Sequence, residues 1–247
     1  MRNIYIASLL LAGSQAYTQS VVPDNIRATH TIEKLTDING SGQTELYVGI
    51  PMPAGKVVGT NYFDENWNTG SFLLYNQKVV ENYPIRFDIE ANEIDIKVKD
   101  QVKVIRGDQV KSFTWKDADL QRPLYFLNAK DFKTAEGVPF TGFLQVMSDG
   151  AMPLFKRTYV VVRKATYNMA LDMGSKDDKI TKKNDFYILQ DGKLVKMPSS
   201  KKKLLPFFGE QAPAIDKLIK EKQLVLSNEG DLTIIFEHYN ALVESKS

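Results

Sequence analysis

The sequence holds few side chains suited to nucleophilic or metal-dependent catalysis. Its 247 residues include no cysteine and only two histidines, His30 and His238. Without cysteine the chain has no thiol nucleophile, disulfide, thiolate-bound metal or lipidated N-terminal cysteine. Neither histidine stands in a Gly-x-Ser-x-Gly or His-Glu-x-x-His pattern. We therefore interpret both as structural residues and expect no metal and no cofactor.

Acidic residues supply the remaining catalytic possibility, because a pair of carboxylates is enough for glycoside hydrolysis. The candidates are Asp64, Glu65, Glu90, Glu93 and Asp95. Glu93 and Asp95 alternate with isoleucines, and this alternation is typical of the solvent face of a strand. We therefore predict no catalytic residue and keep a carboxylate-dependent hydrolase of envelope polymers as the alternative.

Three short motifs have plainer interpretations than binding. Gly49–Lys56 resembles a phosphate-binding loop, but five residues rather than four separate its glycines and Val57 replaces the Mg²⁺-binding hydroxyl. Arg106–Asp108 spells the Arg-Gly-Asp tripeptide of adhesion ligands, yet glycine and aspartate are what any tight turn selects. Lys201–Lys203 is predicted to begin a helix in solvent rather than to bind anionic lipid.

Aromatic residues are the remaining candidates for ligand binding. Four of them, on predicted strands or beside them, are proposed to line a ligand site: Trp67, Tyr75, Trp115 and Tyr125. Aromatic side chains on the concave side of a curved sheet can hold a glycan, an apolar ligand or a peptide. The alternative is that they form the hydrophobic core.

The elements that must position these residues are mainly strands. Apolar residues recur with a period of two in about a dozen short runs across residues 45–198, for example Ile94–Val98. Asp149-Gly150 and Asp191-Gly192 predict two-residue hairpin turns. Lys176–Asn184 is polar and is predicted to be an exposed loop. We expect a curved antiparallel meander and leave open whether it forms a half-barrel, a barrel or a sandwich.

Residues 199–247 are predicted to form a helical C-terminal segment. Pro206 and Gly209 limit the first helix to a turn or two, and Pro213 suits the start of a second. Ser227 or Asn228 can cap a last helix with one apolar stripe. Such helices are marginal alone in water, so we expect them to pack on the sheet or on each other.

The first 16 residues have the layout of a secretory signal peptide. A short basic start is followed by the apolar run Ile4–Ala12 and by small residues before a cleavage point after Ala16. A membrane anchor is the alternative, but the run is about half of the ~20 residues that a span requires. We expect residues 17–44 to be a lead-in to the β domain, with no transmembrane span in the mature chain. The predicted location is the periplasm, the outer membrane or the exterior.

Charge gives the mature chain no general reason to bind nucleic acid or an anionic membrane. The full chain has 32 basic and 30 acidic side chains, a net charge of +2. Removing residues 1–16 deletes Arg2 and no acidic residue, which leaves a net charge of +1. Near-neutral proteins lack the field that attracts polyanions.

Several motifs resemble those of a bacterial family. They are Gly59-x-x-Tyr62-Phe63-x-x-x-Trp67-x-x-Gly70, Tyr83–Asp88, Asn92–Ile96, Lys202–Phe208, Ile219–Leu224, Glu229–Leu232 and Tyr239-Asn240. In these motifs the chain resembles uncharacterised exported proteins of Bacteroidetes-type bacteria. The resemblance implies an exported envelope protein with a β-rich body and a helical tail, and it supplies no activity. Pro206 and Gly209 depart from the pattern, where uninterrupted helix is expected.

The functional hypothesis that follows is a non-catalytic envelope protein. It binds an unknown partner, a glycan or an apolar ligand through its curved sheet. The alternatives are the hydrolase above and a structural subunit of an outer-membrane assembly.

Overall fold

The computed structural model describes residues 55–116, 123–134, 137, 140–168 and 171–245. All of them belong to one unit, residues 53–247. The predicted signal peptide, the lead-in at 17–44, His30 and most of the Gly49–Lys56 motif lie outside the described residues.

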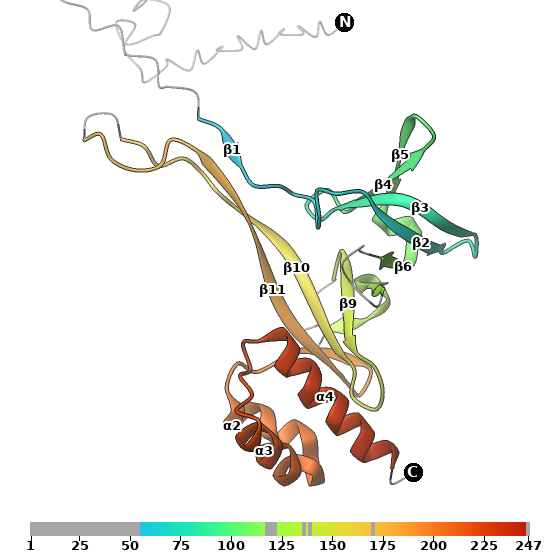
Figure 1. Cartoon of the computed structure of the whole chain (residues 1–247), viewed down its shortest axis with the longest axis vertical. Coiled ribbons are helices and arrows are strands. Elements are labelled where there is room, and N and C mark those ends of the chain that lie inside the picture. The colour runs from blue at the N-terminus through green and yellow to red at the C-terminus, as the bar shows by residue number, and fades with distance from the viewer. Residues whose placement is uncertain (1–54, 117–122, 135–136, 138–139, 169–170, 246–247) are drawn as a thin grey trace, which may run out of the picture. The chain divides into compact units, whose positions relative to one another are not determined.

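Within the described residues, twelve strands form one sheet, as expected for a mainly β protein. They are β1 Val57–Val58, β2 Asn68–Leu74, β3 Val79–Asp88, β4 Glu93–Val98, β5 Gln101–Arg106, β6 Val110–Lys116, β7 Leu124–Asn128, β8 Lys133–Thr134, β9 Phe143–Ser148, β10 Leu154–Arg163, β11 Asp178–Gln190 and β12 Lys193–Lys196. Their order is β5-β4-β3-β2-β6-β7-β9-β10-β11-β12-β8, and β1 pairs with β11. Among the strands that the structure describes, only the β1–β11 and β12–β8 pairs are parallel. Over the described residues the sheet does not close into a barrel. Figure 1 shows the long pair β10–β11 and the C-terminal helices at one end of it.

The two Asp-Gly sequences behave differently. Asp191 and Gly192 both have positive φ angles, 49° and 71°, and form the predicted two-residue turn between β11 and β12. The prediction is wrong in detail at Asp149-Gly150, where residues 149–153 connect β9 to β10. Gly150 has a φ of 128° there, and the longer turn is held by a helix, as shown below.

The loop predicted at Lys176–Asn184 is a second correction, because residues 178–184 belong to β11. They pair with the outer half of β10, from Thr158↔Asn184 to Arg163↔Lys179. Most of these side chains are exposed or half-buried, so polar residues carry no penalty there. Backbone pairing and polar side-chain contacts form this part of the strand, and they leave no hydrophobic period in the sequence.

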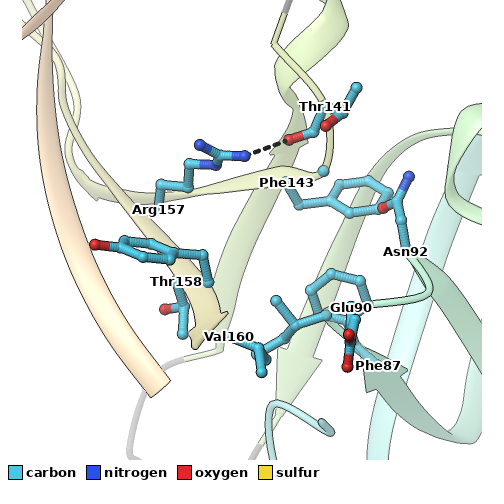
Figure 2. Close-up of a pocket in the computed structure, with 11 residues that line it drawn as sticks. Phe87, Glu90, Asn92, Thr141, Phe143, Arg157, Thr158 and Val160 are labelled. Atoms are coloured by element: carbon cyan, nitrogen blue, oxygen red, sulfur yellow. Dashed lines mark hydrogen bonds between the residues drawn. The ribbon is translucent and has the colours of Figure 1, made fainter. Parts of the chain in front are cut away.

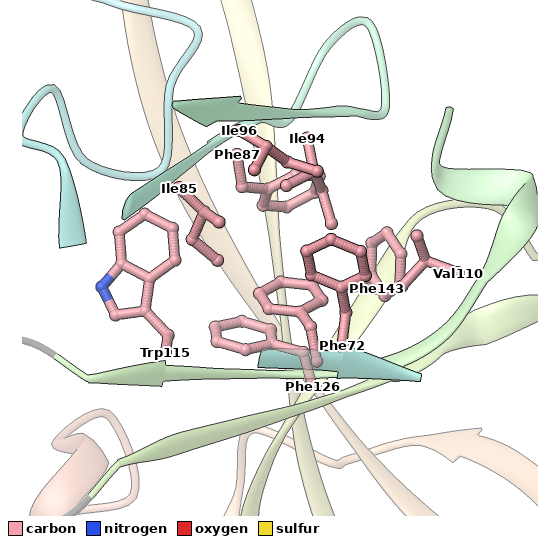
Figure 3. Packing of buried hydrophobic residues seen from close by; sticks show 10 residues of the cluster. Phe72, Ile85, Phe87, Ile94, Ile96, Val110, Trp115, Phe126 and Phe143 are labelled. Atoms are coloured by element: carbon pink, nitrogen blue, oxygen red, sulfur yellow. The ribbon is translucent and has the colours of Figure 1, made fainter. Parts of the chain in front are cut away.

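The sheet curls around a cluster of aromatic and aliphatic side chains (Figure 3). The cluster contains Phe72, Ile85, Phe87, Ile94, Ile96, Val110, Phe113, Trp115, Phe126 and Phe143. Phe87 of β3 and Phe143 of β9 meet edge to face, with ring centroids 5.4 Å apart. Three strands separate β3 from β9, so a flat sheet would place them roughly 19 Å apart at about 4.8 Å per strand. The predicted curvature is therefore confirmed, and we call the face that carries this cluster the inner face.

A short segment links the two sides of the curl. β1 pairs with β11 at Val57↔Asp178, and six residues after Val57 the Phe63 N donates to Phe87 O of β3 at 2.7 Å. Lys182 Nζ of β11 donates to the carbonyl oxygen of Phe63 at 3.0 Å. The Phe63 ring packs edge-on against Trp115 and Phe126 in the inner-face cluster.

The C-terminal segment forms α2 Lys201–Leu204, a 3₁₀ stretch at Leu205–Gln211, α3 Ala212–Glu221 and α4 Glu229–Glu244. Gly209 breaks the helix with φ 50° and ψ −124°, as the sequence predicts. Asn228 caps α4 by accepting a hydrogen bond from Asp231 N. The helices pack on the sheet through a second cluster: Met152, Leu154, Ile188, Leu204, Phe208, Ile215, Ile219, Leu232, Ile235 and Phe236. The expected docking of the helical tail is confirmed.

Asn240 fixes α4 to the turn between β9 and β10. Its side chain is 4% exposed, and its Oδ1 accepts from Met152 N at 2.8 Å. Its Nδ2 donates to Ser148 Oγ and to Asp149 O. A Cβ at Gly150 would lie 2.8 Å from the Asn240 side chain, so only glycine fits against it. This contact explains why the turn is longer than two residues.

Replacing Asn240 tests this docking. In Asn240→Ala the buried Met152 N–H loses its acceptor, and we expect the free energy of unfolding to fall by about 2–3 kcal/mol. Urea unfolding followed by circular dichroism measures the change. The control is Glu237→Ala on the exposed side of the same helix, with an expected change within about 0.5 kcal/mol. Equal effects of the two substitutions would contradict the role assigned to Asn240.

Candidate functional site

The four aromatic residues predicted to bind a ligand lie in different environments. Trp115 is 1% exposed and belongs to the inner-face cluster. Trp67 is half-buried against the Arg86 guanidinium, whose strand neighbours Ile85 and Phe87 face inward. Tyr75 is half-buried and donates to Asp131 Oδ1 at 2.7 Å, and Tyr125 is 54% exposed on β7. The structure does not bring the four together.

The candidate acids also serve separate structural roles. Asp64 accepts hydrogen bonds from Asn66 N and Asn68 Nδ2 within its own turn. Asp95 pairs with Arg86, at 2.9 Å. No group of three or more acids or histidines among the described residues could hold a metal ion. His238 is half-buried on α4, and the Arg106 guanidinium pairs with Asp108 inside the predicted turn.

Arg86 is the centre of a polar cluster on the outer side of β3 and β4. We call this cluster, which also contains Tyr62, Trp67 and Asp95, the latch. Its guanidinium lies 4.3 Å from the ring centroid of Tyr62 and 4.4 Å from that of Trp67. Tyr62 OH and Arg86 both donate to Asp95 Oδ2, at 2.9 Å each. The latch ties the segment before β2 to the hairpin β3–β4, because these contacts join three elements at one carboxylate. Burial, followed by the hydrogen bond to Asp95, raises the pKa of Tyr62 above its ordinary value.

The candidate binding site is a pocket on the inner face, between the turn after β3 and the middle of β10 (Figure 2). The strand register places it there: Phe126 of the inner-face cluster pairs with Gln145, and Gln145 pairs with Lys156. Thr158 and Val160 follow Lys156 on the same side of β10. The pocket has a volume of about 250 Å³.

One wall of the pocket is apolar. Phe87 and Phe143 are the edge of the aromatic cluster, and Ile89 and Val160 continue the wall. Thr158 sits beside Val160, and its hydroxyl donates to Asn184 Oδ1 at 2.9 Å. The pocket is therefore the part of the concave face that the core side chains leave unfilled.

Two charged side chains provide the polar side. Arg157 lies with its guanidinium 4.4 Å from the ring centroid of Phe140 and donates to Thr141 O at 3.5 Å. Arg157 alternates with Thr158 along β10, so its side chain leaves the strand on the other face and lines the pocket beside Thr141. A guanidinium has five N–H donors. Burial raises the pKa of Tyr187, and the positive charge of Arg157 partly offsets this rise. Glu90 is exposed, and its carboxylate makes no hydrogen bond or ion pair with the described residues.

Asn92 completes the polar side. It occupies the left-handed region, with φ 53°, at the turn between β3 and β4. Its Oδ1 is buried without a hydrogen-bond partner among the described residues. A Cβ at Gly107 would lie 2.4 Å from this oxygen, so the glycine allows Asn92 to pack closely.

A chain of polar contacts holds the floor of the pocket. Asn184, which accepts from Thr158, donates to Glu229 Oε1 at 2.7 Å. Glu229 Oε2 pairs with Lys156 Nζ at 2.7 Å. Because Glu229 begins α4, the position of Thr158 depends on the docking of that helix.

Sequence reasoning considered Glu90 but did not identify Arg157, Thr158 or Asn92 as site residues. Arg157-Thr158 interrupts the apolar residues of β10, and that interruption is the signal that could have indicated a site. It could not show which distant segment faces the strand.

Comparisons with protein-family models, curated proteins and solved structures give no significant match. In the portion of the chain that the structure covers, no helix is long and apolar enough to cross a membrane. The resemblance to exported proteins of Bacteroidetes-type bacteria stays a prediction.

The latch predicts a dependence of stability on alkaline pH. Because the pKa of Tyr62 is raised in the folded state, its contribution is complete below about pH 10 and is lost as pH rises through the folded value. Stability of the wild type should therefore be constant relative to Tyr62→Phe below about pH 10 and fall relative to it as pH rises further. Urea unfolding of both proteins across this range measures the difference, and a difference that does not change with pH would contradict the latch.

Proposed function

We propose that the chain is an exported, non-catalytic binding protein whose inner-face pocket holds a single sugar residue of a glycan. The observation that carries the proposal is the pairing, in one pocket, of an apolar wall with a free carboxylate at Glu90 and a guanidinium at Arg157. A sugar ring has apolar C–H faces and a rim of hydroxyl groups that both donate and accept. It therefore matches a pocket with one apolar wall and a few convergent polar groups.

The size of the pocket supports a small ligand. Sites for drug-sized molecules span roughly 300–1,000 Å³, and this pocket is smaller, at about 250 Å³. An apolar ligand such as a lipid tail fits less well, because it would bury Glu90, Asn92 and Arg157 without hydrogen-bond partners.

The hydrolase alternative has weaker support. A paired-carboxylate mechanism requires two acids on opposite sides of the scissile bond. Among the residues that line the pocket, Glu90 is the single acid. We therefore favour binding over hydrolysis.

Filling the pocket tests the proposal. Val160→Trp places an indole in the space between Phe143 and Thr158, whereas Val162→Trp is a matched control two residues along the same side of β10 and outside the pocket. We expect N-acetylglucosamine or glucose to shift the amide resonances of residues 157–160 in a saturable way. Val160→Trp should abolish this binding, and Val162→Trp should keep it.

A second variant tests the chemistry. Glu90→Gln replaces a charged hydrogen-bond acceptor with a neutral one. We expect the free energy of sugar binding to weaken by about 1.4 kcal/mol, which corresponds to about tenfold lower affinity. Circular dichroism shows whether each variant is folded. Saturable binding of dodecanoate in place of the sugars, or sugar binding unaffected by Val160→Trp, would overturn the proposal.

Export is tested separately. Cleavage after Ala16 predicts that protein purified from the cell envelope of its native host begins at Tyr17. N-terminal sequencing measures this directly. Protein with an intact Met1 in the cytosolic fraction would contradict export.

A further inference from the structure

Strand β5 ends the sheet on one side and leaves an unpaired backbone edge. It pairs with β4 along its whole length, from Val98↔Gln101 to Glu93↔Arg106, and no described strand lies on its other side. We propose that this edge binds an extended acidic segment of a partner protein by β-strand addition. The proposal is independent of the sugar pocket.

The hairpin geometry indicates which backbone groups face the partner. Lys99 and Asp100 form the two-residue turn between β4 and β5, and Lys99 has a φ of 55°. In such a turn the flanking residues Val98 and Gln101 are a hydrogen-bonded pair, and bonded and non-bonded pairs then alternate. Val102 and Val104 are therefore in non-bonded pairs with β4 and direct their N–H and C=O groups toward the free edge.

The side chains of the same two residues are available to a partner. Val102 and Val104 are each 53% exposed. They pair with Lys97 and Asp95, whose side lies opposite the inner-face cluster. Lys97 Nζ is 6.0 Å from the Trp67 ring centroid, so an aromatic residue lies over β4, the neighbour of the edge strand. An added strand would gain main-chain hydrogen bonds from the edge and side-chain contacts from the valines.

Charge selects an acidic partner over a second copy of the chain. Residues 97–106 contain three lysines, Lys97, Lys99 and Lys103, against one aspartate, Asp100, while Arg106 is paired with Asp108. None of the three lysines has an ion pair with the residues that the structure describes. Antiparallel pairing of two β5 strands would place only basic residues, Lys103 and Arg106, across one short ladder, and like charges there are destabilising.

The edge also lacks the features that most firmly prevent strand addition. Edge strands are protected by proline, by a bulge or by very short length, as well as by charge. β5 has six residues and no proline, and its register with β4 is continuous. The pairs β2–β3, β2–β6 and β9–β10 each contain a register shift. Lysine is the one protective feature of β5. Its positive charge would attract the carboxylates of an acidic partner rather than repel them.

A peptide titration tests the proposal. The probe is an acetylated peptide Glu-Val-Glu-Val-Glu-Val-Glu, added to the ¹⁵N-labelled protein, with Lys-Val-Lys-Val-Lys-Val-Lys as its control. We expect the acidic peptide to slow hydrogen exchange at the amides of Val102 and Val104. Its binding should weaken as salt rises from about 0.01 M to about 1 M, because the Debye length falls from about 30 Å to about 3 Å.

Two variants separate the backbone from the side chain. Val104→Pro removes one outward N–H at an edge position where proline is tolerated, and should weaken peptide binding at least about tenfold. Val104→Thr keeps the N–H and the branched side chain, and should bind within about threefold of the wild type. Lys103→Glu, which retains the backbone, should also weaken binding of the acidic peptide.

Several results would overturn the proposal. They are equal binding of the lysine peptide, unchanged binding to Val104→Pro, protection at residues outside β5, and no binding of the acidic peptide. Dimerisation through β5 in sedimentation experiments without peptide would also overturn it, since the occupant would then be a second copy.

Discussion

The contact between Phe87 and Phe143 is the constraint on which the rest of the structure depends. These rings belong to strands separated by three others, and they can touch only because the sheet curls. Phe113 lies between them in the same cluster and stacks on Phe126, with centroids 4.4 Å apart. Aromatic packing of this kind buries large apolar areas in specific geometries. The curl brings the turn after β3 opposite β10, and the inner-face pocket exists because of that approach.

The helical tail and the latch complete the arrangement from two sides. Asn240 fixes α4 to the end of β9 and β10, and Glu229 at the start of the same helix holds the floor of the pocket through Asn184. On the outer side, Arg86 holds the segment that links β11 to β3. Buried or half-buried polar contacts of this kind are costly when only partly satisfied, so they specify one docking position for each element. The pocket therefore lies between elements that such contacts hold in place.

The sequence predicted local structure well where a periodic pattern coincides with burial. The alternation in Ile94–Val98, the turn at Asp191-Gly192 and the cap at Asn228 were all identified from neighbouring residues. The aromatic candidates show the limit of this reasoning. Trp115 is buried and Tyr125 is exposed because they lie on opposite faces of the sheet. Alternation alone does not show which face of a strand points inward. That depends on the curvature of the whole sheet, which is a long-range property.

The features that the sequence could not predict depend on segments that lie far apart in the chain. The pairing of β1 with β11 joins residues about 120 positions apart, and its energy comes from backbone hydrogen bonds that leave no pattern in residue type. The outer half of β11 is polar for the same reason. Likewise, nothing in the sequence relates Glu90, in the turn after β3, to Arg157 on β10, and it is the curl that places them at one pocket.

A crystal structure of the protein with N-acetylglucosamine would test the central claim most directly, because it locates the ligand without reference to affinity. We expect a sugar ring against the wall formed by Ile89 and Val160, with its hydroxyl groups bonded to Glu90 and Arg157. A pocket closed by its own side chains, or a sugar bound elsewhere on the sheet, would contradict it.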